Sequence, residues 1–292
     1  MKPKLKVLIV FGLAFLAGCS DIQSLSSTQQ EDATDPANYA QATEGQAALL
    51  SAFYGLDGAL PSFASYRICG QFGFTDGMPV IFSTEVDIET LEAGDFQVTL
   101  QDGQNFSVGC ATPAPAEDQG EFRTILLVGD FGSINNQPAT VSVTGNIISL
   151  DQTTNFIGQS VAATLLEDGP FLVHAEVVDK ANWQIGKQAT RLPFGGGDAC
   201  PASTKQIIRV VWSGGVTKPG GDEINDEEVQ AYKVLLADNT TTRPFAIGDL
   251  GDGDNNHELC LDTETTVLSI EFPEGLMTDP REDLNPATTI SL

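Results

Sequence analysis

Two segments decide the fold: Pro79–Val86 (Pro-Val-Ile-Phe-Ser-Thr-Glu-Val) and Phe96–Leu100 (Phe-Gln-Val-Thr-Leu). Apolar and polar residues alternate strictly in the second segment and partly in the first, which is the period of a half-buried β-strand. Turn signals stand at 101–103 and 167–170. Further segments rich in strand-forming residues are 140–146 and 171–178. Many short strands separated by turns predict an all-β protein built of β-sandwiches.

The chain repeats a series of landmarks in one order. A Cys precedes a strand that ends in an aromatic residue, with 13 residues from Cys69 to Phe82 and 12 from Cys200 to Trp212. The first copy then has 96–98, Cys110, 124–128 and 136–140, and the second has 232–234, Cys260, 266–270 and 285–288. The shared order predicts two copies of one sandwich. The alternative is chance similarity among strand-rich segments.

The first 18 residues have the parts of an export signal. Three lysines lie within the first six residues, and the apolar run Val7–Ala17 is shorter than the roughly 20 residues that span a bilayer. The run ends in Leu16-Ala17-Gly18-Cys19, which resembles the lipobox of bacterial lipoproteins. The alternative is an ordinary secretory signal with an incidental Cys.

The lipoprotein resemblance implies a lipid anchor on Cys19. In that family the thiol receives a diacylglyceryl group and the new N-terminus an acyl chain, and several chains together give stable membrane binding. Ser20 follows the Cys, where an Asp in enterobacterial lipoproteins causes retention in the inner membrane. The resemblance therefore implies an outer-membrane lipoprotein of a Gram-negative host, facing the periplasm or the cell surface.

A second resemblance concerns the first copy. The pattern Phe82-Ser83-x-x-Val86-Asp87-x-x-Thr90-Leu91, followed by Asp95-Phe96-x-Val98, resembles the opening of bacterial Ig-like domains of surface-layer type. In the second copy an acidic stretch replaces the Thr-Leu pair. The family implies an Ig-like sandwich with a mechanical or adhesive role.

These observations define the expected organisation. We expect a signal peptide over 1–18, the lipidated Cys and a flexible tether over 19–47, a first sandwich with extra strands over 48–185 and a second sandwich over 195–292. Ala48–Leu56 is interpreted as either a first strand or a helical turn.

Charge limits the class of partner. The 292 residues include 14 Lys or Arg and 40 Asp or Glu, a net charge of −26, and removal of residues 1–18 makes it −29. So few basic residues argue against nucleic acid and against electrostatic docking on anionic lipid. The expected partners are the membrane, through the anchor, and an unidentified protein or glycan.

Four cysteines remain besides Cys19. An exported chain meets an oxidising compartment, and four cysteines allow three pairings. The duplication favours Cys69–Cys110 and Cys200–Cys260. Zinc is disfavoured because no Cys-x-x-Cys pair is present and the chain has two His.

The segment from Gly248 to Glu258 is dense in oxygen ligands. A calcium loop would use Asp249, Asp252, Asp254, Asn256 and Glu258. The EF-hand spacing fails, because His257 and Thr263 stand where Gly and Glu are required. The alternative is an acidic hairpin turn. No other cofactor is expected.

We expect a non-catalytic binding or structural module of the cell envelope. The rival is a secreted hydrolase with an active site between the two domains, which a deep cleft with converging carboxylates or His would favour. The third hypothesis is an envelope-assembly component, which a long unpaired apolar strand edge would favour.

Overall fold

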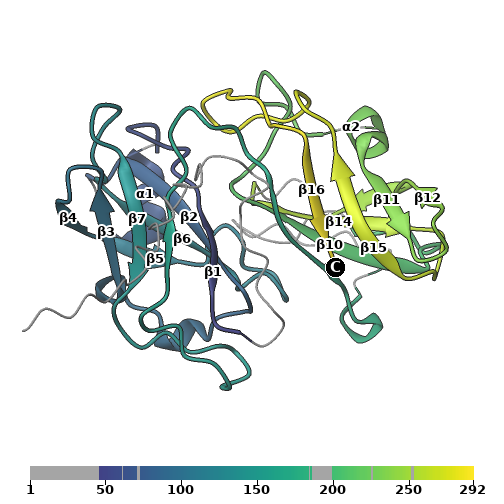
Figure 1. Cartoon of the computed structure of the whole chain (residues 1–292), viewed down its shortest axis with the longest axis horizontal. Helices are drawn as coiled ribbons and strands as arrows, with labels where there is room; N and C mark the ends of the chain where they lie inside the picture. Colours follow the sequence, from purple (N-terminus) through teal and green to yellow (C-terminus); the bar gives the residue numbers. More distant parts are fainter. Residues whose placement is uncertain are drawn as a thin grey trace, which may run out of the picture. The chain divides into compact units, whose positions relative to one another are not determined.

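The computed structural model describes residues 46–60, 62–70, 73–183, 185, 199–224, 226–250 and 253–292. These ranges form sixteen β-strands, two short α-helices and a few single-turn 3₁₀ helices (Figure 1). The expected signal, Cys19 and most of the tether lie outside the described residues. Among the described residues, no helix has both the length and the apolar character to cross a membrane.

Four antiparallel sheets pair into two sandwiches. The first sandwich contains the sheets β1-β2-β6-β5 and β4-β3-β7-β8. Its strands are β1 (Leu49–Ala52), β2 (Asp76–Phe82), β3 (Phe96–Leu100), β4 (Asn105–Ser107), β5 (Cys110–Thr112), β6 (Thr124–Gly129), β7 (Pro138–Val143) and β8 (Ser160–Ala162). Side chains from both sheets share one core, which contains Met78, Phe82, Val98, Leu127 and Val141. The all-β sandwich prediction is confirmed.

The second sandwich contains the sheets β13-β14-β10-β9 and β12-β11-β15-β16. Its strands are β9 (Leu172–Val177), β10 (Gln206–Trp212), β11 (Lys233–Leu236), β12 (Thr241–Thr242), β13 (Ala246–Gly248), β14 (Asn256–Leu261), β15 (Val267–Phe272) and β16 (Thr288–Ser291). Its core centres on Trp212, which packs edge-on against Phe272 and Tyr232.

The two sandwiches have one topology. Adding eight to each strand number of the first sandwich turns β1-β2-β6-β5 into β9-β10-β14-β13 and β4-β3-β7-β8 into β12-β11-β15-β16, which are the observed sheets. The two sandwiches thus have the same order of strands, both within each sheet and along the sequence. This identity of strand order is what a duplication would produce.

The sequence landmarks match this topology only at their start. Residues 79–86 and 208–216 correspond to β2 and β10, and Phe96 begins β3 as the second copy's landmark begins β11. Beyond this point the pairing was one strand out of step, because 124–128 lies in β6 whereas 266–270 lies in β15, the counterpart of β7. Short apolar strands resemble one another in composition, so matching by residue type skipped a strand.

The sheets also locate the change from one sandwich to the other. β9 pairs with β10 and therefore belongs to the second sandwich. The first domain expected over 48–185 would contain this strand. The residues of 171–178 favour a buried strand in either sandwich. Their composition therefore does not reveal which sheet the strand joins.

Burial on both faces explains the most apolar strands. In β10, Ile208, Val210 and Trp212 enter the second core. Val211 on the opposite face contacts the first sandwich, and Ile207 packs beside a disulfide. In contrast, β3 alternates between buried and half-buried residues, as its sequence predicts.

Helices are minor features. The two α-helices in the described part of the chain are α1 (Ser62–Cys69) and α2 (Asp226–Ala231). Residues 49–52 form β1, which settles the ambiguity at Ala48–Leu56 in favour of a strand.

Both favoured disulfides are present. Cys69–Cys110 joins the end of α1 to β5, and Cys200–Cys260 joins the segment before β10 to β14. Each bridge closes within one sandwich. The second cysteines occupy different strands of the shared topology, β5 and β14, so the two bridges are not strictly equivalent.

Candidate functional site

The sandwiches meet through an apolar contact. Leu50, Phe53 and Ile81 of the first pack against Phe171, Val173 and Val211 of the second. Gly214 lies against the ring of Phe53, and a Cβ at this position would overlap that ring. The edge strand β1 is buried along its whole length. The contact therefore covers apolar surface that a free first sandwich would expose.

A group of buried charges extends this contact, and Arg123 and Glu176 form its shortest pair. Arg123 immediately precedes β6 and is 5% exposed, and its Nη2 donates to Glu176 Oε2 over 2.6 Å. The Nη1 of the same guanidinium donates to the Ser83 carbonyl over 3.1 Å. Because Glu176 lies on β9, this ion pair joins the two sandwiches.

Glu176 is held in its ionised form. Burial raises the pKa of its carboxyl. The hydrogen bond to His174 and the charge of Arg123 lower the pKa by more than burial raises it, and the net value is about 2. His174 Nε2 lies 3.5 Å from Glu176 Oε2. Burial lowers the pKa of His174, although Glu176 opposes this effect. His174 is therefore a packed residue beside an ion pair.

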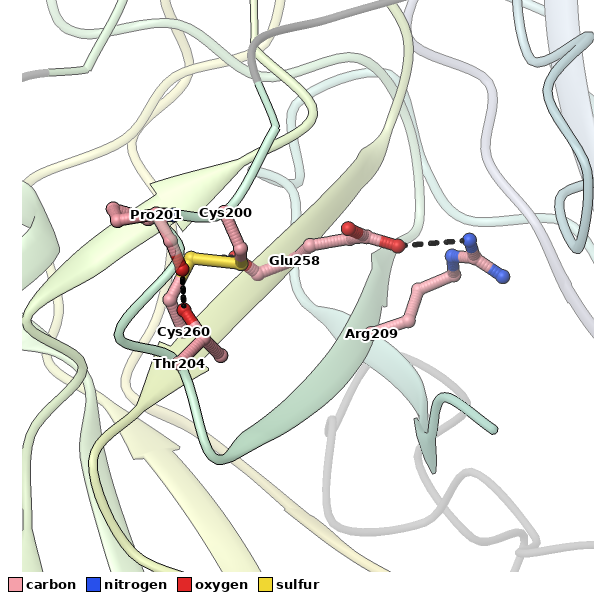
Figure 2. Close-up of a disulfide and its surroundings, with 6 residues drawn as sticks. All are labelled: Cys200, Pro201, Thr204, Arg209, Glu258 and Cys260. Atoms are coloured by element: carbon pink, nitrogen blue, oxygen red, sulfur yellow. Dashed lines mark hydrogen bonds and ion pairs between the residues drawn. A yellow bond between two sulfur atoms is a disulfide. The ribbon is translucent and has the colours of Figure 1, made fainter. Parts of the chain in front are cut away.

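Arg209 is the second buried guanidinium. It lies on β10, and its Nη2 donates to Glu258 Oε1 and to the Gln119 carbonyl, each over 3.1 Å. Figure 2 shows the pair of Arg209 and Glu258 beside the Cys200–Cys260 disulfide. Burial lowers the pKa of Arg209, but the charges of Glu258 and nearby carboxylates outweigh it and raise the pKa. Since Gln119 belongs to the first sandwich, Arg209 also bridges the junction.

An acidic group lies beside Arg209. One carboxylate oxygen from each of Asp118, Glu121 and Asp249 lies within 4.8 Å of the others. Glu121 is fully buried, and its Oε2 accepts a hydrogen bond from the Asp118 backbone N–H over 2.9 Å. Burial, and then the charges of Asp254 and Asp249, hold the pKa of Glu121 well above its usual range. This group is a candidate cation site.

The structure separates the five residues expected to form a calcium loop. Asp249 joins Asp118 and Glu121, whereas Glu258 pairs with Arg209. Asp254 Oδ1 accepts from the backbone N–H of Asn256 over 2.7 Å, as in a turn stabilised by its own Asp. Asp252 lies outside the described residues. Asp249, Asp254 and Glu258 therefore take part in three different local contacts.

A cavity of about 230 Å³ lies beside this loop and is lined by Asp254, Asn256 and His257, among others. His257 Nδ1 is 2.9 Å from the Tyr232 hydroxyl, which accepts from Trp212 Nε1 over 2.8 Å. Burial lowers the pKa of His257 to about 4. The imidazole is therefore neutral at pH 7. Its hydrogen bond to Tyr232 connects it to the core of the second sandwich.

The charges at the junction were not predicted from the sequence. Arg209 interrupts the apolar run Ile208–Trp212, and Glu176 interrupts an equally apolar strand. A charged residue inside a strand that is otherwise apolar on both faces is a signal for a buried ion pair, because an unpaired buried charge is costly. Glu121 and Arg123 lie in a turn and carry no such signal.

Comparison with known proteins does not identify a family for this chain. No family model and no curated protein matches the chain. Among solved structures, the N-terminal part of the bacterial S-layer protein SbsC is similar over 84% of this chain, with 12% identity and a TM-score of 0.28. This chain spans 44% of that structure's length. The class that the structure defines is an all-β protein of paired antiparallel sandwiches.

Proposed function

We propose that this chain is a non-catalytic outer-membrane lipoprotein that serves as a binding or structural module of the cell envelope. The observation that carries this proposal is that the buried guanidinium groups of Arg123 and Arg209 both contact the half-buried carboxylate of Glu176 between the two sandwiches. These ionisable groups are engaged in holding two folded units together. A module that transmits force or spaces a partner from a membrane needs such a fixed junction.

The topology supports the Ig-like part of the proposal. The sheets β1-β2-β6-β5 and β4-β3-β7-β8 have the order of strands A-B-E-D and C′-C-F-G in immunoglobulin sandwiches. β2 ends at Phe82 and β3 begins at Phe96, where the Ig-like motif places a strand end and a strand start. Ig-like sandwiches recur in surface proteins that bind or space other molecules, although the fold alone does not fix a function.

The anchor part of the proposal rests on residues 1–19. A basic start, a short apolar run and Leu-Ala-Gly-Cys occur together there. A diacylglyceryl group plus an N-acyl chain provides more than the two hydrophobic signals that stable anchoring requires.

Substitution of the anchor tests the proposal. Cys19→Ser, expressed from the full precursor, is expected to move the protein from the outer-membrane fraction to the soluble fraction. Ser20→Ala keeps the thiol and is the matched control, which should stay with the membrane. Sedimentation of Cys19→Ser with the outer membrane would contradict the proposal.

The second candidate function is a secreted hydrolase. Its active site was expected between the two domains, whereas the described residues that line the cavity beside His257 belong to the second sandwich. Asp254 and His257 are the ionisable pair that this hypothesis would use, and both line the cavity. The test is hydrolysis of ester, peptide and glycoside substrate sets by purified protein and by His257→Gln. Activity that disappears in the variant would favour the hydrolase over the module.

A further inference from the structure

The cavity beside His257 lies at one end of the second sandwich. Of the described residues that line it, those at 215–223 follow β10, those at 249–250 and 253–254 connect β13 to β14, and Pro280 lies between β15 and β16. In immunoglobulin order the first and last of these segments are the B–C and F–G loops, which bind antigen in antibody variable domains. The volume of about 230 Å³ equals that of about eight waters in the liquid. The cavity therefore has the position and the size of a site for a small molecule.

His257 reaches this cavity from the inside of the sandwich. It pairs with Val210 across adjacent strands, and Val210 enters the second core, so the imidazole lies on the same face of the sheet. Trp212 Nε1 donates to the Tyr232 hydroxyl over 2.8 Å, and an indole N–H can only donate. The hydroxyl therefore donates its own proton to His257 Nδ1 over 2.9 Å. This chain of bonds makes Nδ1 an acceptor.

The other ring nitrogen of His257 is a donor without an acceptor. Burial lowers the pKa of this imidazole to about 4, so at pH 7 the ring is neutral and carries its proton on Nε2. No acceptor for this N–H lies within hydrogen-bond distance among the described residues. The residue is only 4% exposed, and native structures rarely leave such a donor unsatisfied. Since His257 lines the cavity, the occupant of the cavity has to supply the acceptor.

The charge of the cavity wall disfavours an anionic occupant. Glu223, Asp249 and Asp254 line the cavity, and none of the described lining residues is Lys or Arg. The neutral imidazole of His257 adds no positive charge. Carboxylates accept hydrogen bonds, whereas the imidazole N–H donates one. The occupant therefore needs both donors and an acceptor, which hydroxyl groups provide and an ammonium ion does not.

The remaining wall suits C–H groups. Val216, Leu250 and Pro280 contribute apolar side chains to it. Small-molecule sites commonly combine such apolar surface with a few polar groups that fix the orientation of the ligand. A sugar ring has the matching composition, because it carries several hydroxyl groups on a frame of C–H groups. The polar and the apolar parts of the wall therefore agree on one class of ligand.

We propose that this cavity binds one neutral sugar residue, with His257 Nε2–H donating to an oxygen of the sugar and the acidic wall accepting from its hydroxyl groups. The proposal names the ligand class of the binding module and rests on that part of the proposed function. It does not depend on the lipid anchor, so a failure to bind sugar would leave the outcome of the Cys19→Ser test unchanged.

The test is a sugar titration of the full chain in a detergent without sugar headgroups. Tryptophan fluorescence is one readout, because Trp212 is connected through Tyr232 to His257, and calorimetry gives the stoichiometry. The probes are glucose, galactose, mannose and N-acetylglucosamine, which have no glycosidic bond for a hydrolase to cut. We expect at least one of them to saturate one site per chain with a Kd on the order of 1 mM. No saturation at concentrations up to about 100 mM would overturn the proposal.

Two further probes define the ligand. Glucuronate adds a carboxylate to the same ring and is expected to bind at least about tenfold more weakly, because the wall is acidic. Equal binding of glucuronate would contradict the choice of a neutral ligand. The methyl glycosides of the same sugars separate the two sources of a sugar residue. Binding that they retain supports the end of a glycan as the ligand, and binding of the free sugars alone supports a free monosaccharide.

Three variants localise the site. His257→Asn keeps an acceptor for the Tyr232 hydroxyl but lacks the Nε2–H group. Gly215→Val narrows the cavity and leaves His257 in place, and a Cβ at Gly215 would lie 3.6 Å from the Asp254 carbonyl oxygen, an ordinary contact. Each should weaken binding at least about tenfold. Gly94→Val is the matched control in the first sandwich, where a Cβ meets open space, and it should bind as the unmodified chain does. Unchanged affinity in both His257→Asn and Gly215→Val would overturn the proposal.

Discussion

Arg123 of the first sandwich donates to Glu176 of the second over 2.6 Å, and this bond lies where two copies of one fold meet. Because β9 carries Glu176 outward from its own core, the residue is available to the neighbouring copy. Arg209 lies 3.5 Å from the other oxygen of the same carboxylate. One Glu thus contacts two buried arginines, which makes it the central residue of the junction.

Glu176→Gln is expected to lower the free energy of unfolding by about 3 kcal/mol at pH 7. The pKa of Glu176 is about 2 in the folded chain against an ordinary 4.5, and each unit corresponds to about 1.4 kcal/mol. The depressed pKa means that this stability is present above pH 4.5 and is lost as pH falls toward 2. Denaturant unfolding between pH 2 and 7 measures the effect.

The control for this prediction is Glu264→Gln. Glu264 forms an ion pair with Lys180 in which both side chains are about two-thirds exposed. Water and salt screen such pairs, so no measurable change is expected. Equal effects of the two substitutions would show that the contacts of Glu176 with two buried arginines contribute nothing.

Gly120→Ala is expected to displace Arg209. Gly120 has a φ of +95°, and a Cβ there would overlap the Arg209 guanidinium. Gly103 also has a positive φ, +84°, but a Cβ there meets open space. Gly103→Ala therefore measures the backbone cost alone, about 1–2 kcal/mol.

The difference between these two variants isolates the close approach. We expect Gly120→Ala to be less stable than Gly103→Ala by about 2 kcal/mol, because the guanidinium loses its bond to the Gln119 carbonyl. Thermal unfolding of both variants in one buffer makes the comparison. Equal losses would mean that Arg209 adapts without cost.

Asp279→Asn is expected to stabilise the protein above pH 6. Burial raises the pKa of Asp279 to about 6, above its ordinary 3.8. A raised carboxyl pKa favours the folded state at low pH, and this contribution is lost as pH rises through 6. Asn keeps the oxygen that accepts from the backbone N–H groups of Arg281 and Asp283.

The pH profile provides the internal control for Asp279→Asn. Near pH 4 the variant and the unmodified chain should have similar Tm values, and at pH 8 the variant should be more stable by up to about 3 kcal/mol. A variant that is less stable at pH 8 would show that Asp279 accepts a further bond in its charged form.

Loss of either disulfide is expected to cost about 4 kcal/mol. The bridges span 41 and 60 residues, and the chain-entropy model gives a similar value for both loops. The double variants Cys69→Ser/Cys110→Ser and Cys200→Ser/Cys260→Ser are compared by denaturant unfolding. Full stability in either variant would contradict the role assigned to its bridge.

Local patterns in the sequence predicted the strands and the cysteine pairs. The alternation of Phe96–Leu100 reports a strand with one face on a core, and that property is local. The duplication was visible because Cys69 and Cys200 precede the corresponding strands β2 and β10 by similar distances. The number of residues between each Cys and the following strand is similar in the two copies because the segment that connects them is short.

The junction could not be predicted from the same patterns. Arg123 and Glu176 are 53 residues apart, and only the packing of the sandwiches brings them together. Likewise Asp249 was predicted to share a calcium loop with its sequence neighbours, but it lies beside Asp118 and Glu121, which are more than a hundred residues earlier. Side chains that converge through tertiary contact carry no periodic signal.

The distance between the two sandwiches tests the central claim of a fixed junction most directly. Spin labels on unnatural amino acids at the exposed positions Asn105 of β4 and Lys233 of β11 report it by pulsed electron resonance. The account predicts one narrow distance distribution for the unmodified chain and a broad one for Glu176→Gln. A broad distribution in the unmodified chain would contradict the account.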